Sequence, residues 1–309
     1  MSQASSVRIT VPATTANIGP GFDCLGAALS LYNHFTFTRL APDEESLIIR
    51  ATGAESDRVQ TDARNLAYQA FTKVYDHLGQ PVPSLLLEID LNVPLARGLG
   101  SSATAIVGGL VGANALADFP LNRQTVMELA IALEGHPDNV VPALLGGCQL
   151  SATTATATWE ICDIPWHSAI APVVAIPNFE LSTAAARQVL PGQYSRADAI
   201  FNTAHLGLLV RGLATGHEAW LRTALSDRIH QPYRQTLIPG YETVQTEAIA
   251  AGAYGVVISG AGPTILALTA PDQAPAVQAA MIRAWATQGI QASAQVLQID
   301  QQGAIVQYP

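Results

Sequence analysis

A glycine-rich segment between two apolar runs constrains the fold of this chain more than any other feature. The segment VPLARGLGSSATA (93–105) follows SLLLEIDL (84–91), which has the residue types and length of a strand. After the glycines, a largely apolar stretch with a helical pattern begins at about Ser101 and extends to Ala117, broken by glycines and Asn114. The pattern therefore predicts a strand, a loop and a helix, with the loop at the N-terminus of the helix.

The glycine loop has the features of a lysine-free anion site. Gly98 and Gly100 let backbone N–H groups approach an anion, while Ser101 and Ser102 add hydroxyls at the positive end of the helix dipole. A Walker A loop is excluded, because the only lysine, Lys73, precedes the loop. A dinucleotide turn is disfavoured, because no second strand ending in an acidic residue follows. The alternative is a flexible connection before a capped helix.

Composition limits the remaining function classes. The chain has 309 residues, of which 49% are hydrophobic, enough for two domains with full cores. Its net charge of −9 argues against nucleic acid or an anionic membrane as a partner. Three widely spaced cysteines predict neither a disulfide framework nor a zinc cluster. The N-terminal residues lack the pattern of a signal peptide, and we expect a cytoplasmic protein.

Hydrophobic periodicity predicts a mixture of helices and strands along the whole chain. VRITVPA (7–13) and HFTFTRL (34–40) alternate as strands do, and Asn122 and Gly135 bound a helical pattern as its cap and its stop. After about residue 152 the sequence becomes polar and rich in threonine, and helical patterns then recur near 195–213, 216–225, 240–251 and 273–288. The prediction is an α+β protein with one domain over 1–160 and another over 161–309.

Three motifs in order resemble those of a known superfamily. PLARGLGSSATA (94–105) resembles the ATP phosphate loop of the GHMP kinases, and GVVISGAGPTILAL (255–268) resembles their C-terminal glycine motif. PATTANIGPGFDCLGAAL (12–29) is similar to the N-terminal motif of the homoserine kinase family within that superfamily. The resemblance spans residues 7 to about 298. It implies an N-terminal domain like ribosomal protein S5 domain 2 and a ferredoxin-like C-terminal domain.

The resemblance also implies ATP and Mg²⁺ as cofactors and assigns residues to them. Ser102 and Glu128 are expected to ligate Mg²⁺, although Glu128 also suits a solvated helix face. Asn65 matches an adenine-pocket residue, and it suits equally a helix N-cap. Arg97 is expected either to touch a phosphate or to face solvent. The other ATP-binding residues implied are Pro94, Leu95, Ala96, Gly98, Leu99, Gly100 and Ser101.

The family pattern implies an amino-acid substrate, L-homoserine, phosphorylated on its hydroxyl as a step towards threonine. Carboxylates and amides are expected at the ammonium end of the substrate and two arginines at its carboxylate end. Asn139 is expected to hydrogen-bond the attacking hydroxyl without acting as a base, and Asp138 as a base is the weaker alternative. The substrate-binding residues implied are Asn17, Asp23, His136, Asp138, Thr183, Arg187 and Arg234.

Alternative functional interpretations of the same motifs have less support from the sequence. A mevalonate-type GHMP kinase would pair an N-terminal lysine with an aspartate, and the N-terminal segment has no lysine. A non-catalytic sensor would have degraded motifs, and a purely structural domain would not need three motifs in order. We also expect a homodimer, as in the family, and ordering of residues 183–194 or of the segment around Arg234 when substrate binds.

Overall fold

The computed structural model describes residues 5–41 and 45–308, so the first four residues of the N-terminal segment, for which no signal-peptide pattern was predicted, lie outside it. The first of two sheets has seven strands, and β3 and β4 are parallel whereas the other pairs are antiparallel. Its order is β11–β1–β2–β4–β3, with β5 on β2 and β6 on β5. The strands are β1 (Ser6–Ala16), β2 (Leu25–Arg39), β3 (Leu47–Gly53), β4 (Leu85–Leu91), β5 (Cys148–Thr153), β6 (Trp159–Ile164) and β11 (Ile305–Gln307).

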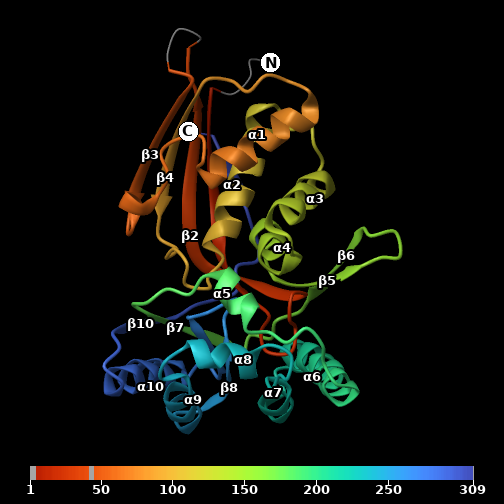
Figure 1. Ribbon diagram of the computed structural model, residues 1–309, viewed down its shortest axis with the longest axis vertical. Coiled ribbons are helices and arrows are strands. Elements are labelled where there is room, and N and C mark those ends of the chain that lie inside the picture. The colour runs from red at the N-terminus through yellow and green to blue at the C-terminus, as the bar shows by residue number, and fades with distance from the viewer. Residues whose placement is uncertain (1–4, 42–44, 309) are drawn as a thin grey trace.

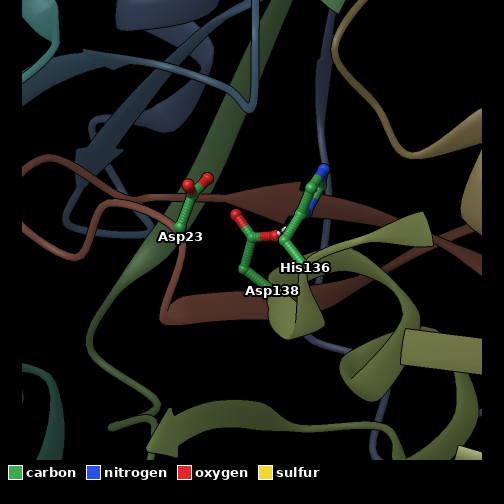
Figure 2. A group of neighbouring side chains, drawn as sticks. All are labelled: Asp23, His136 and Asp138. Carbon is green, nitrogen blue, oxygen red and sulfur yellow. Dashed lines mark hydrogen bonds and ion pairs between the residues drawn. The ribbon is translucent and has the colours of Figure 1, made fainter. Parts of the chain in front are cut away.

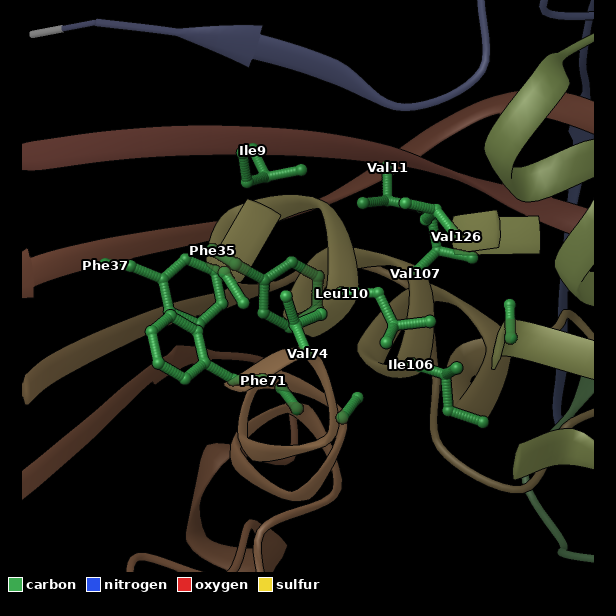
Figure 3. Close-up of a cluster of buried hydrophobic side chains, with 14 of the residues drawn as sticks. Ile9, Val11, Phe35, Phe37, Phe71, Val74, Ile106, Val107, Leu110 and Val126 are labelled. Carbon is green, nitrogen blue, oxygen red and sulfur yellow. The ribbon is translucent and has the colours of Figure 1, made fainter. Parts of the chain in front are cut away.

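Four helices pack on one face of this sheet (Figure 1). They are α1 (Leu66–Leu78), α2 (Ser101–Leu116), α3 (Arg123–Glu134) and α4 (Pro137–Leu145). The helix predicted between Asn122 and Gly135 is confirmed, since Asn122 accepts the Thr125 N–H and Gly135 ends the helix with a positive φ. Aromatic and branched side chains fill the space between sheet and helices, as Figure 3 shows for Phe35, Phe71 and their neighbours.

The second sheet has the order β10–β7–β9–β8 and is antiparallel throughout. Its strands are β7 (Ala171–Pro177), β8 (Ala253–Ile258), β9 (Ile265–Thr269) and β10 (Ala292–Val296). The succession β7, helices, β8, β9, α10, β10 is that of a ferredoxin-like unit. The helices are α5 (Thr183–Gln188), α6 (Arg196–Thr215), α7 (Glu218–Ala224), α8 (Gln231–Arg234), α9 (Tyr241–Ala250) and α10 (Ala274–Thr287), with single 3₁₀ turns at Ser56–Arg58 and Gln235–Leu237.

The two faces of the second sheet bury different cores. Helices α9 and α10 cover one face. The other face packs against α6, α7 and the ends of β1, β2 and β5, so the two sheets share an apolar boundary (Figure 1). Because the boundary is continuous, loops from both sheets meet along it. No helix in the described part of the chain is long and apolar enough to cross a membrane.

The predicted division at residue 160 does not coincide with the division between the sheets. Strand β6 continues to Ile164 in the first sheet, and β11 returns from the C-terminus to pair with β1. Strands β1 and β2 are also longer than the alternating runs suggested, and they reduce the connecting loop to residues 17–24. Main-chain pairing between distant segments sets these limits, and hydrophobic periodicity does not report it.

Candidate active site

A cavity of about 520 Å³ lies where the three glycine-rich motifs come together. Its size is typical of a small-molecule site. The glycine loop is joined to the C-terminal motif, because Ser259 donates its hydroxyl to the Gly98 carbonyl at 2.7 Å and Thr264 N–H donates to Arg97 O. The loop after β1 is joined to the same motif, because Asn17 Nδ2 donates to Gly260 O at 2.8 Å. The glycine loop, the loop after β1 and the C-terminal motif, which are far apart in sequence, are therefore bonded together at one side of the cavity.

The glycine loop needs glycine at its two close contacts. Gly98 and Gly100 both have positive φ angles, of 76° and 67°. A Cβ on Gly98 would lie 2.3 Å from Ser259 O, and one on Gly100 would lie 1.9 Å from the Thr14 hydroxyl. Gly100 is also the N-cap of α2, so the unpaired N–H groups of that helix begin at the cavity. The predicted helix therefore begins at the cavity, with its first N–H groups where an anion site was expected.

The carboxylate beside Ser102 is Glu134, and the expectation for Glu128 is wrong in its position. Ser102 donates its hydroxyl to Glu134 Oε1 at 3.0 Å, and both residues line the cavity. Glu128 lies on the exposed face of α3 and accepts a hydrogen bond from Gln124. Burial raises the pKa of Glu134, although the neighbouring His136 and the Ser102 hydroxyl oppose the shift. The sequence feature that could have identified Glu134 is its position at the end of α3, directly before Gly135.

Arg97 neither contacts solvent freely nor has a free guanidinium for a phosphate. It is buried, and its donors are used by Pro177 O at 3.2 Å and Leu95 O at 3.0 Å. Glu55 and Glu180 lie within ion-pair distance of the same guanidinium. Arg97 therefore does not face solvent, and although it lines the cavity its guanidinium is already engaged: the side chain connects the glycine loop to the segment that follows β7.

The remaining nucleotide-side predictions divide into residues of the cavity and residues beside it. Leu95, Ala96 and Ser101 line the cavity, whereas Pro94 does not line it and Leu99 is buried in the core between the sheets. Asn65 lines the cavity and is also the N-cap of α1, accepting the N–H groups of Ala67 and Tyr68. Its amide Nδ2 donates to Gln60 O at 2.7 Å, so it holds the adjacent loop.

Asp23, His136 and Asp138 also line the cavity and lie close to one another (Figure 2). Their ligand atoms lie within 4.8 Å of one another. Asp138 is buried, and its carboxylate accepts a hydrogen bond from His136 Nδ1. Burial lowers the pKa of His136, but the hydrogen bond and charge of Asp138, with Glu134 and Asp23, outweigh it and raise the pKa overall. The cluster is rich in negative charge and suits a cationic group.

The two predicted arginines are held differently from one another. Arg187 makes a two-pronged ion pair with Asp23, at 2.9 and 2.8 Å. Arg234 is almost fully buried and donates to Ala186 O and Gly260 O. Within residues 5–41 and 45–308 Arg234 has no carboxylate partner. In this structure Asp23 and Arg187 pair with one another, so the expected acidic end and basic end are in direct contact.

Asn139 lies beneath the glycine loop and is oriented by a neighbour. Its Oδ1 accepts the hydroxyl of Thr14 at 2.8 Å, which leaves the amide Nδ2 as the group that can donate. Asn139 is buried and lines the cavity together with the more exposed Thr183 at the start of α5. An amide held in this way can donate a hydrogen bond to an oxygen but cannot accept its proton.

The raised pKa of His136 predicts a pH-dependent stability. A group whose folded-state pKa is raised stabilises the fold fully below its ordinary pKa and loses that contribution as pH rises through the folded value. The free energy of unfolding should therefore fall more steeply between about pH 6 and pH 8 in the wild type than in His136→Gln. Urea unfolding across this range measures the difference, with His77→Gln on the exposed face of α1 as the control. Parallel curves for wild type and His136→Gln would contradict the prediction.

The fold and the lysine-free glycine loop define a class of small-molecule kinases. The family model described as GHMP kinases N terminal domain matches residues 65–147, and that described as GHMP kinases C terminal matches residues 209–287. A homoserine kinase from Trichormus variabilis is 66% identical over 98% of this chain and 100% of its own length, and one from Nostoc punctiforme is 65% identical over 98% and 99%.

A solved structure agrees with these sequence relatives. The crystal structure of homoserine kinase from Cytophaga hutchinsonii superimposes with a TM-score of 0.89 at 30% identity, covering 99% of both chains. The predicted two-domain fold is therefore confirmed. The chain belongs to the homoserine kinase family of the GHMP kinases.

Proposed function

We propose that this protein transfers the γ-phosphoryl group of ATP to the hydroxyl of L-homoserine, giving ADP and O-phospho-L-homoserine, a step towards threonine. The observation that carries the proposal is the buried guanidinium of Arg234, which has no carboxylate partner among the described residues. A buried charge without a counter-ion is costly, and an anionic ligand removes that cost. The acidic cluster around Asp138 supplies the complementary site for an ammonium group.

A zwitterion is the ligand that fits the Asp23–Arg187 pair. If only a carboxylate entered, it would bind the arginines but leave Asp23 without its partner. If only an ammonium group entered, it would leave Arg187 unpaired. An α-amino acid supplies both charges and exchanges one ion pair for two, so discrimination against singly charged analogues follows from the unpaired group left behind.

The nucleotide side suits a phosphate chain with a hard cation. Ser102 and Glu134 present oxygen donors next to the loop amides, the ligand type that Mg²⁺ prefers. Glu134 is partly buried, and no lysine or arginine in residues 5–41 and 45–308 pairs with it, so a cation has a carboxylate available. We propose that these two residues hold Mg²⁺, which when bound neutralises charge on the transferred phosphoryl group.

The residues of the site act mainly by positioning and by electrostatic stabilisation. The loop amides and the N-terminus of α2 stabilise phosphate charge. Asn139, fixed by Thr14, donates to the substrate hydroxyl oxygen and aligns it for in-line attack on the γ-phosphorus. Phosphoryl transfer has a loose transition state, so the hydroxyl proton leaves late and needs no strong base.

The proposed mechanism, in which no strong base takes part, predicts a small effect of Asp138→Asn on kcat. The amide retains the shape of Asp138 but removes the charge that attracts the ammonium group, so the KM for homoserine should rise about tenfold or more. We expect kcat to fall by less than about tenfold, in contrast to the loss of 10² or more that removal of a general base produces. Steady-state kinetics separate the two parameters. A loss of kcat above a hundredfold with unchanged KM would assign Asp138 as the base.

Coupled measurement of ADP release tests the proposed function directly. L-Homoserine, mevalonate and no acceptor are compared at saturating Mg-ATP, and turnover is expected with L-homoserine alone. Turnover with mevalonate would overturn the zwitterion site, and ATP binding without any turnover would favour a sensor. The proposal includes a cytoplasmic homodimer, on the family resemblance, and light scattering should give twice the chain mass of 32.4 kDa.

A further inference from the structure

Phe22 lies behind the substrate side of the cavity, next to both arginines. The Cζ atom of Arg234 is 4.9 Å from the centroid of its ring, and that of Arg187 is 5.7 Å from it. Phe22 is partly buried and is absent from the residues that line the cavity. Two cations thus lie near one aromatic ring that does not line the cavity.

The Phe22 ring lies beside two positive charges, those of Arg187 and Arg234, which repel one another. Burial lowers the pKa of Arg234, and the positive charge of Arg187 adds to that effect. The face of an aromatic ring is negative and attracts cations whose charge lies within about 6 Å of its centroid. We propose that Phe22 is a positioning residue that holds the guanidinium groups of Arg187 and Arg234 side by side, so that one substrate carboxylate binds both.

His230 fixes the position of the Phe22 ring. The two rings stack with centroids 5.1 Å apart and an interplanar angle of 24°. His230 is fully buried, and its Nε2 donates to Gly19 O at 2.8 Å, which ties it to the loop carrying Phe22. Asp227 accepts the N–H groups of His230 and Gln231 and so anchors the start of α8, the helix that ends in Arg234. His230 therefore contacts the Phe22 ring and also immediately precedes the helix that carries Arg234.

The loop that carries Phe22 has a strained backbone, so it needs contacts such as that with His230 to hold its conformation. Asn17, Ile18 and Asp23 all have positive φ, and a branched residue such as Ile18 is unfavourable there. Such residues persist when surrounding contacts hold them. Burial lowers the pKa of His230, with Arg234 contributing and Asp227 and Asp23 opposing, so the ring adds no third positive charge beside the arginines.

The inference rests on the proposed function, and the test separates the two. Phe22→Leu removes the ring but retains an apolar side chain, Phe22→Tyr retains the ring, and Phe22→Met is a second variant without a ring. The matched control is Phe201→Leu, because Phe201 also stacks on a histidine, His205, and faces an arginine, Arg228, yet does not line the cavity. Each variant is assayed with L-homoserine and with 3-aminopropan-1-ol, which lacks the carboxylate, as substrate or competing inhibitor.

The expected result is a loss specific to the carboxylate. In Phe22→Leu and Phe22→Met the preference for homoserine over the amino alcohol should fall about tenfold, with the KM for ATP unchanged. Phe22→Tyr and Phe201→Leu should keep the wild-type preference. An unchanged preference in a folded ring-less variant, or an equal loss for both compounds, would overturn the inference. If the wild type does not phosphorylate homoserine, the proposed function fails instead.

Discussion

Replacing Glu134 by glutamine is expected to lower kcat for homoserine phosphorylation by about 100- to 1000-fold. The carboxylate lies next to the Ser102 hydroxyl at the edge of the glycine loop, and glutamine retains its size while removing its charge. Without that charge, the proposed Mg²⁺ site loses its carboxylate ligand. Steady-state kinetics at several Mg²⁺ concentrations measure the loss, and the concentration giving half-maximal activity should rise in the variant.

The matched control is the same substitution at Glu128. Both glutamates are on α3, but Glu128 is exposed and its contact is with Gln124. We expect Glu128→Gln to change kcat by less than about twofold, since isolated surface charges contribute little. Comparable losses in the two variants, or a loss in Glu128→Gln alone, would contradict the assignment of Glu134. Thermal unfolding of both proteins separates a catalytic effect from a change in stability.

Replacing Arg234 by methionine is expected to lower kcat/KM for homoserine by about 10² to 10³, mostly through KM. Methionine fills the buried volume but cannot pair with the substrate carboxylate or donate to Ala186 O and Gly260 O. Lysine should rescue little, because a single ammonium group cannot make the divergent hydrogen bonds of a guanidinium. Kinetics with homoserine, together with nucleotide affinity measured in its absence, test the prediction.

Arg222→Met provides the control for Arg234→Met. Arg222 also donates to a backbone carbonyl, Ala253 O, and lies over an aromatic ring, that of Tyr254, but it does not line the cavity. Its loss should leave kcat/KM within about twofold of the wild type. If Arg234→Met folds and retains wild-type KM for homoserine, Arg234 does not bind the substrate carboxylate. If nucleotide affinity falls equally, the defect is general and not specific to the amino acid.

Short-range features of this protein were predictable from its sequence. Asn65, Asn122 and Gly135 bound helices where the capping pattern placed them, because a cap depends on contacts within a few residues. The glycine loop and the helix after it form as the pattern indicated, since the left-handed backbone at Gly98 and Gly100 is a property of glycine. The resemblance of the three ordered motifs added the fold and the family.

Positions that depend on long-range packing were decided by the tertiary structure alone. Glu128 and Glu134 are both carboxylates on α3, and only the orientation of that helix brings the second to Ser102. The burial of Arg97 depends on Pro177 at the end of β7 and on Glu55 after β3, and the return of β11 to β1 joins the two ends of the chain. Sequence patterns report which face of an element is apolar, whereas the partner of a charged group depends on which distant segments pack together.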